Sequence, residues 1–133
     1  MTLPADVVAR PLAAGDGPGL SALVEACDRT YLDWAPAGWT APEVGPDWAI
    51  RFIEPERWSC CVCAADGLIV GFASFRPARR SETPGRPGGP PLEGVAHVGA
   101  VFVHPARWRE GIAGWLLHGA EREMRARGYT AAS

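Results

Sequence analysis

The chain lacks the features that mark exported, membrane-bound or nucleic-acid-binding proteins. No run of about eighteen apolar residues occurs, and Met1–Arg10 lacks the basic segment and apolar core of a secretory signal. The formal net charge is only −2, so the chain has no overall attraction for nucleic-acid phosphates or anionic lipids. We therefore expect a cytoplasmic protein with neither nucleic acid nor membrane as its partner.

The four cysteines lack the spacing of a metal site or a disulfide framework. Cys60, Cys61 and Cys63 share one short apolar run, and Cys27 lies far before them, so the paired C-x-x-C spacing of a zinc site is missing. Strand alternation places Cys60 on one face and Cys61 and Cys63 on the other. We expect reduced, buried thiols and no metal.

What the chain does have is the content of one packed domain. Its 133 residues are 47% hydrophobic and 21% charged, which is typical of a globular protein and leaves no room for two cores. No internal repeat is visible. Residues 1–133 are therefore expected to form a single domain.

The first half of the sequence predicts one strand and two helical stretches. Residues 7–12 indicate a short strand, and Pro11 favours a sheet edge or the end of the strand. Asp16 is expected to cap a helix whose apolar residues recur at helical spacing as far as Tyr31. A long loop rich in proline, glycine and tryptophan follows, before a short helical stretch at 48–54.

The middle of the sequence predicts a hairpin and an exposed loop. Residues 58–65 and 68–76 are β-prone runs joined by Asp66 and Gly67, a pair that suits a tight turn with positive φ at both positions. Residues 77–94 contain five prolines and four glycines, so we expect a flexible loop there.

The last part predicts a strand, a helix and the start of another strand. Residues 95–103 read as a strand, 111–127 as a helix ended by Gly128, and 129–133 as a strand that begins there. The helix has one apolar face, formed by Ile112, Leu116, Ala120 and Met124. This order of elements predicts an α/β or α+β domain with a mixed sheet.

The junction between the last full strand and the last helix carries the chemical signal. Such a junction directs unpaired amides and the positive end of the helix dipole toward one point, where a phosphate binds well. Arg107 and Arg109 are placed to add charge-assisted contacts. Small residues let a ligand approach the backbone closely, and the junction has Gly111, Ala113 and Gly114. Many strand-to-helix turns carry glycine for packing alone, so the pattern by itself leaves both readings open.

This junction resembles the central motif of the GNAT superfamily of N-acetyltransferases. In that motif a strand ending in apolar-aromatic-Val-x-Pro precedes Arg/Gln-x-x-Gly-x-Gly/Ala and an apolar helix. Residues 101–105 match the strand end, and 108–113 match the loop. Trp108 replaces the usual Arg or Gln, and Ala113 replaces the more usual Gly. Glu110 brings a carboxylate beside the expected phosphate, which weakens binding unless it points away.

The resemblance implies a particular fold. It is a mostly antiparallel mixed sheet with splayed central strands, flanked by helices and incomplete at the C-terminus in this chain. We expect the chain to be truncated after the start of its fifth strand. An unpaired strand edge favours pairing with another chain. The resemblance thus predicts either a homo-oligomer formed through the open edge or a piece of a longer product.

The resemblance also implies the residues that bind the co-substrate acetyl-CoA, with no metal involved. The pantetheine arm would pair with the strand backbone as an added strand does, along Val101, Phe102 and Val103. The diphosphate would be held by the loop and the helix start, that is by Trp108, Arg109, Glu110, Gly111, Ile112, Ala113 and Gly114.

Catalysis in this family needs a base for the amine, often acting through water. The family commonly places it about four residues before the position of Val101, which here is His97, with Glu93 four residues further back. A histidine has a suitable pKa for this role. A strand histidine without chemistry is the competing interpretation.

The acceptor amine would be bound by the loop after the first helix. Aromatic faces attract a cationic amine and a carboxylate orients it, which makes Tyr31, Asp33, Trp34 and Trp39 the candidates. The alternative is that these tryptophans only cover the core. The sequence therefore predicts an N-acetyltransferase that moves the acetyl group to a primary amine by direct attack. The competing hypothesis is a non-catalytic acyl-CoA-binding or interaction module.

Overall fold

A computed structural model describes residues 2–80 and 88–133. The strands form one five-stranded sheet in the order β1-β2-β3-β4-β5. The pairs from β1 to β4 are antiparallel, and β4 pairs with β5 in parallel. The strands are β1 (Val7–Pro11), β2 (Trp58–Ala64), β3 (Ile69–Arg79), β4 (Pro91–Val103) and β5 (Ala131–Ala132), and the helices are α1 (Gly17–Asp28) and α2 (Ile112–Ala126). This confirms the predicted mixed, mostly antiparallel α/β fold.

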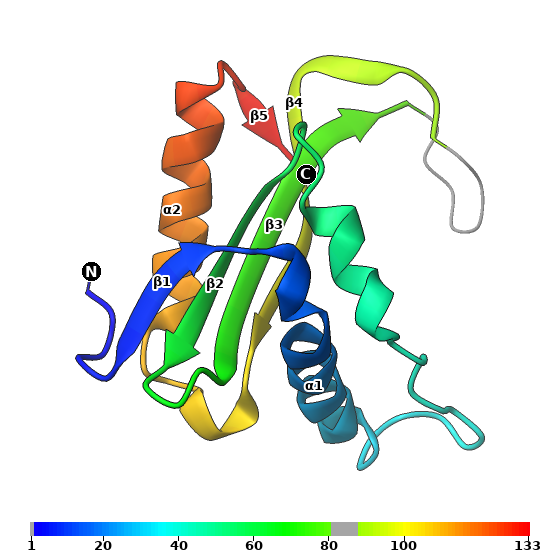
Figure 1. Cartoon of the computed structure of the whole chain (residues 1–133). Coiled ribbons are helices and arrows are strands. Elements are labelled where there is room, and N and C mark those ends of the chain that lie inside the picture. The colour runs from blue at the N-terminus through cyan, green and yellow to red at the C-terminus, as the bar shows by residue number, and fades with distance from the viewer. Residues whose placement is uncertain (1, 81–87) are drawn as a thin grey trace.

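The two helices cover opposite faces of the sheet (Figure 1). On one face Phe72 of β3 packs against Leu20 and Leu23 of α1. On the other face Ala73 packs against Ile112 and Leu116 of α2. Each fully buried Leu, Ile or Phe side chain contributes about 1.5–3 kcal/mol to the free energy of unfolding, because apolar surface is removed from water. The alternation of β3 therefore fixes both helices against one central strand.

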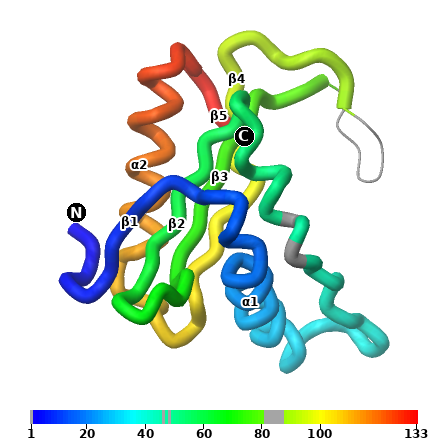
Figure 2. Tube along the Cα trace, viewed as in Figure 1, coloured from blue at the N-terminus to red at the C-terminus, as the bar shows by residue number. Residues whose placement is uncertain are grey.

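Short 3-10 helices complete the chain between these elements, and their backbone path is traced in Figure 2. The second predicted helical stretch is one of them, so it is a 3-10 helix rather than an α-helix. They are η1 (Ala14–Asp16), η2 (Arg29–Tyr31), η3 (Pro46–Phe52) and η4 (Pro105–Arg107). Among the helices in the described ranges, none has the length and apolar character needed to cross a membrane.

The β2–β3 hairpin forms as predicted, but its turn differs. Residues 65–68 connect the strands, and in this turn only Gly67 has a positive φ, of 86°. The Gly67 amide donates to the Ala64 carbonyl at 2.9 Å, and the Asp66 carboxylate accepts from the Leu68 amide at 3.0 Å. The prediction of positive φ at both Asp66 and Gly67 is wrong, because the Asp66 side chain holds a longer turn.

The predicted loop at 77–94 is wrong at both ends. Strand β3 continues to Arg79, with Ala78 buried, and β4 already begins at Pro91. Proline is tolerated at the first residue of a strand, and cross-strand pairing overrides the local composition. The part of this prediction that falls on residues 81–87 lies outside the described residues.

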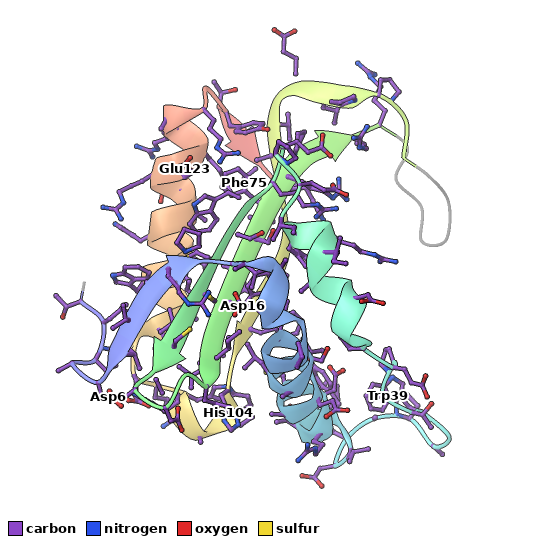
Figure 3. The ribbon with its side chains drawn as sticks, in the orientation of Figure 1. Asp6, Asp16, Trp39, Phe75, His104 and Glu123 are labelled. Carbon is purple, nitrogen blue, oxygen red and sulfur yellow. The ribbon has the colours of Figure 1, made fainter. Side chains whose placement is uncertain are left out.

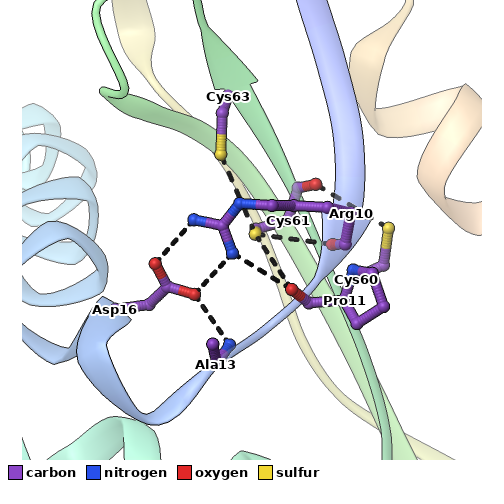
Figure 4. A network of polar contacts seen from close by, with 7 residues as sticks. All are labelled: Arg10, Pro11, Ala13, Asp16, Cys60, Cys61 and Cys63. Carbon is purple, nitrogen blue, oxygen red and sulfur yellow. Dashed lines mark hydrogen bonds and ion pairs between the residues drawn. The ribbon is translucent and has the colours of Figure 1, made fainter.

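Asp16 occupies the predicted cap position of α1 without capping it. Its carboxylate accepts two hydrogen bonds from the Arg10 guanidinium, each 2.7 Å long, and a third of 2.7 Å from the Ala13 amide (Figure 4). The helix itself makes no side-chain cap bond at this end. Asp16 therefore joins β1 to the start of α1, and the helix ends at Asp28, before the predicted Tyr31.

The end of α2 agrees with the prediction. Gly128 has a φ of 87°, and the Tyr129 amide donates to the Met124 carbonyl at 3.0 Å. The Gly128 amide donates to the Arg125 carbonyl at 3.1 Å, which completes a Schellman motif. The chain then turns into β5, where the predicted strand begins.

All four cysteines are free thiols, and the predicted faces are confirmed. Cys61 and Cys63 pack on the α1 side of the sheet with their sulfurs 3.9 Å apart, while Cys60 packs on the α2 side. Burial raises the pKa of the Cys61 thiol to about 12, which keeps it protonated and unreactive near neutral pH.

Candidate functional site

A β-bulge at Gly99 shapes the strand that carries the motif. Ser74 of β3 lies opposite Ala100 and Phe75 lies opposite Val98, so Gly99 is an extra residue in β4. The bulge shifts the alternation, which places Val101 and later odd-numbered residues on the α2 face. This bulge was not predicted from the sequence, although a glycine inside a strand is a signal for one.

Beyond the bulge, one edge of β4 is open. Strand β5 pairs only with Val95 and Ala96, and within the described residues no strand pairs with this edge from Gly99 to Val103. The Val103 carbonyl points to the open side. Backbone groups two residues apart in an antiparallel ladder point the same way, so the amide and carbonyl of Val101 also face it.

The Val103 carbonyl accepts hydrogen bonds from two side chains. The Trp108 indole donates to it at 2.8 Å, and the Cys27 thiol donates to it at 3.3 Å. The Val103 carbonyl is therefore already engaged. The amide and carbonyl of Val101, and the amide of Val103, face the open side of this edge.

The loop after β4 ends in the N-terminus of α2. Arg109 and Gly111 both adopt left-handed backbone conformations, with φ of 67° and 83°. The first helical hydrogen bond runs from the Trp115 amide to the Gly111 carbonyl at 3.0 Å. The amides that precede it have no partner within the helix and lie at the positive end of its dipole, and they belong to Ile112, Ala113 and Gly114.

The open edge and the helix start face one cavity of about 420 Å³, which we call the loop cavity. Its volume lies in the range of small-molecule sites. Its lining comprises Val101, Val103, Arg107, Trp108, Arg109, Gly111, Ile112, Ala113 and Gly114. Most residues predicted to bind the co-substrate thus meet here, while Phe102 and Glu110 do not line this cavity.

Arg107 and Glu110 neutralise one another at its rim. The Arg107 guanidinium donates to the Glu110 carboxylate at 2.6 and 3.1 Å, and to Asp6 at 2.9 Å. These carboxylates raise the pKa of Arg107, and Arg107 holds the pKa of Asp6 below its ordinary value. Arg107 therefore ties the loop to the start of β1, and in the described part Arg109 is the loop arginine without an ion-pair partner.

A second cavity of about 400 Å³, the aromatic cavity, lies on the other side of the same edge. It shares Val101, Val103 and Trp108 with the loop cavity. Its lining comprises Cys27, Thr30, Tyr31, Trp34, Val101, Phe102, Val103 and Trp108. The two cavities therefore meet at the exposed backbone of β4.

Two of the four residues predicted to bind the acceptor line this cavity, and two do not. Tyr31 and Trp34 line it and pack edge to face, with ring centroids 4.9 Å apart. Trp39 lies in the loop after α1 (Figure 3). Its ring centroid is 6.0 Å from that of Tyr31, and it does not line the cavity. Asp33 is exposed and does not line it either.

The predicted base residues lie further along β4. His97 stands opposite Arg76, on the α1 face, and its Nδ1 is 3.2 Å from the Ser133 hydroxyl. Glu93 is exposed. At about 3.3 Å per residue the strand separates Glu93 from Val101 by roughly 25 Å. Neither Glu93 nor His97 lines either cavity, and His97 lies about 13 Å along the strand from Val101.

His104 has a structural contact. Its Nδ1 accepts from the Ala106 amide at 3.1 Å, which caps η4 after the end of β4. Within the described residues, no group of three or more His, Cys, Asp or Glu side chains is placed to hold a metal ion.

The sheet order, the bulged β4 and the amide-lined junction with α2 define an acetyltransferase fold. The chain belongs to the acetyltransferase (GNAT) family, whose model matches residues 24–133. No curated protein matches the chain in sequence.

Solved structures agree with this fold. An N-acetyltransferase from Sphaerobacter thermophilus aligns with a TM-score of 0.70 and 22% identity, over 95% of this chain and 34% of that protein. The chain thus spans about a third of that relative. A Trypanosoma brucei acetyltransferase aligns with a TM-score of 0.64 and 19% identity, over 96% of this chain and 81% of its own. The PaiA N-acetyltransferase of Thermoplasma acidophilum, in complex with coenzyme A, aligns with a TM-score of 0.67 and 16% identity, over 92% and 74%.

Proposed function

We propose that this protein transfers the acetyl group of acetyl-CoA to a primary amine. The observation that carries the proposal is the loop cavity, where the open backbone of Val101 and the free amides at the start of α2 line one space. The PaiA relative's complex with coenzyme A supports the same ligand class.

The chemistry of the loop cavity fits coenzyme A. The amides of Ile112, Ala113 and Gly114, together with the helix dipole, would hold the diphosphate. Arg109 would add a cation, whereas the Glu110 carboxylate is engaged by Arg107. The pantetheine amides would pair with the open backbone of Val101 as an added strand does.

The aromatic cavity would then hold the acceptor amine. Because both cavities share the backbone of Val101 and Val103, the amine nitrogen and the thioester carbonyl would meet at this edge. Acetyl-CoA supplies the activated acyl group. A C–N bond forms while the C–S bond breaks, the amine loses a proton and the thiolate leaving group takes one up. The Val101 amide is placed to donate to the oxygen that gains charge.

His97 is the proposed base. It lies on the α1 face of β4, as does Phe102 at the aromatic cavity, and would accept the amine proton through water. In the tautomer whose Nδ1–H donates to the Ser133 hydroxyl, Nε2 would take up the proton.

The test is release of coenzyme A thiol from acetyl-CoA in the presence of primary amines. We expect amine-dependent release, measured against blanks without acetyl-CoA because the protein has its own thiols. His97→Gln should lower kcat by about 100-fold, while the affinity for acetyl-CoA stays unchanged. Binding of acetyl-CoA without amine-dependent release would instead indicate an acyl-CoA-binding module.

A further inference from the structure

The aromatic cavity has an unusual lining for a site that binds a cationic substrate. Among the described residues that line it, none is an Asp, Glu, Lys, Arg or His. The carboxylates of the same segment, Asp28 and Asp33, do not line it. Its walls are instead the aromatic rings of Tyr31, Trp34 and Trp108, with Phe102 beside them.

Several polar side chains of this cavity are already engaged within the protein. The Thr30 hydroxyl donates to the Cys27 carbonyl at 2.6 Å, and the Cys27 thiol donates to the Val103 carbonyl at 3.3 Å. The Trp108 indole N–H donates to the same carbonyl at 2.8 Å. Among the described lining side chains this leaves the Tyr31 hydroxyl and the Trp34 indole N–H, so a ligand with many hydroxyls would lose more hydrogen bonds to water than it gains.

The charge balance of the cavity also limits the number of cations. One ammonium group can lie over an aromatic face, where the ring quadrupole attracts it. A second or third ammonium buried here would find no carboxylate among the described lining residues to offset its loss of hydration. Polycationic amines are disfavoured for this reason, whatever their shape.

We propose that the aromatic cavity binds a monoamine carried on an apolar, arylalkyl body, and that it discriminates against polyamines and aminoglycosides. This proposal rests on the proposed function, because it assigns the acceptor class of the same site. The aryl group would lie against Trp34 and Tyr31. Its amine would then point to the edge shared with the loop cavity, at Val101 and Val103.

Calorimetry in the presence of saturating coenzyme A separates binding from catalysis. We expect 2-phenylethylamine to bind at least 10-fold more tightly than spermidine or kanamycin. Trp34→Ala should weaken its binding about 10-fold, and because Trp34 is 70% exposed the change should not unfold the protein. Leu117→Ala, at a position on α2 that is 44% exposed, is the control and should change nothing.

Thiol release with the same amines and acetyl-CoA is the second measurement. If 2-phenylethylamine binds in a Trp34-dependent way but no thiol is released, the assignment of the cavity stands and the proposed transfer reaction fails. Tighter binding of spermidine or kanamycin would overturn the assignment. So would the absence of binding by any of the three amines, or equal effects of Trp34→Ala and Leu117→Ala.

Discussion

At the scale of single residues, the Asp16 carboxylate connects the end of β1 to the start of α1. It accepts both 2.7 Å bonds from Arg10 and one from the Ala13 amide (Figure 4). The Arg10 hydrogen bonds hold the pKa of the Asp16 carboxyl below its usual value. The folded state therefore favours the ionised carboxylate, and its stabilisation is lost as pH falls through the lowered pKa.

The contribution of Asp16 to the free energy of unfolding should depend on pH. Asp16→Asn should lower the free energy of unfolding at pH 7 by about 1–2 kcal/mol, because a charge-assisted pair becomes a weaker neutral one. The difference from the unchanged protein should shrink below about pH 4, near the unfolded pKa of an aspartate. Urea unfolding at pH 7 and pH 3 measures both. Asp47→Asn, at an exposed carboxylate, is the control and should change little at either pH. An equal loss of unfolding free energy for Asp16→Asn at the two pH values would contradict this role of the ion pair.

Trp108 departs from the usual family motif but has a defined role in this structure. Where the family commonly has Arg or Gln, the indole donates to the Val103 carbonyl and its ring lines both cavities. The Arg107 and Glu110 pair similarly resolves the predicted conflict between a carboxylate and a phosphate. Neither arrangement could be predicted from the sequence, since each depends on which partner a long side chain meets in three dimensions.

At the scale of elements, the distance between β3 and α2 controls the site. A Cβ atom at Gly71 would lie 2.8 Å from Ile112 Cγ2 and 3.3 Å from Leu116 Cδ1. Both are fully buried, so the helix itself must shift to make room. Since Ile112 is the first residue of α2, that shift moves the amides at the helix start.

Gly71→Ala should therefore affect both stability and ligand binding. We expect a loss of about 1–3 kcal/mol in the free energy of unfolding, which is the range for overpacked cores. Affinity for coenzyme A should fall at the same time. Gly15→Ala is the matched control, because nothing lies within 4 Å of its added Cβ. Thermal unfolding measures the stability of the two variants, and calorimetry measures their affinity for coenzyme A. Equal stability and equal affinity of Gly71→Ala and Gly15→Ala would contradict this prediction.

Some elements could be predicted from short stretches of sequence, whereas others depend on pairing with distant residues. The β2–β3 hairpin, α2 with its stop at Gly128, and the start of β5 follow from short patterns of apolar and turn residues. The bulge at Gly99 depends on the register against β3. The extension of the strands into 77–94 depends on pairing between distant residues. Composition alone predicted a loop there because it does not include the partner strand.

At the scale of the whole molecule, the sheet brings two cavities to the two sides of one open strand edge. The loop cavity offers backbone amides and a free arginine, while the aromatic cavity offers uncharged rings. The sequence motif indicated the first cavity because its chemistry is contiguous along the chain. The second combines α1, the following turn and β4, so its residues could be nominated from the sequence but not placed together.

Recognition of the coenzyme A diphosphate by the start of α2 underlies both the proposed function and the assignment of the aromatic cavity. Calorimetric titration of coenzyme A into the unchanged protein, Ala113→Asp and Leu117→Asp tests it directly. An aspartate in the first turn favours the helix dipole, so Ala113→Asp should fold normally while its carboxylate repels the diphosphate. We predict saturable binding by the unchanged protein and by Leu117→Asp, and at least 10-fold weaker binding by Ala113→Asp, equivalent to about 1.4 kcal/mol. Absence of heat with the folded, unchanged protein, or equal affinity of the two aspartate variants, would contradict the central claim.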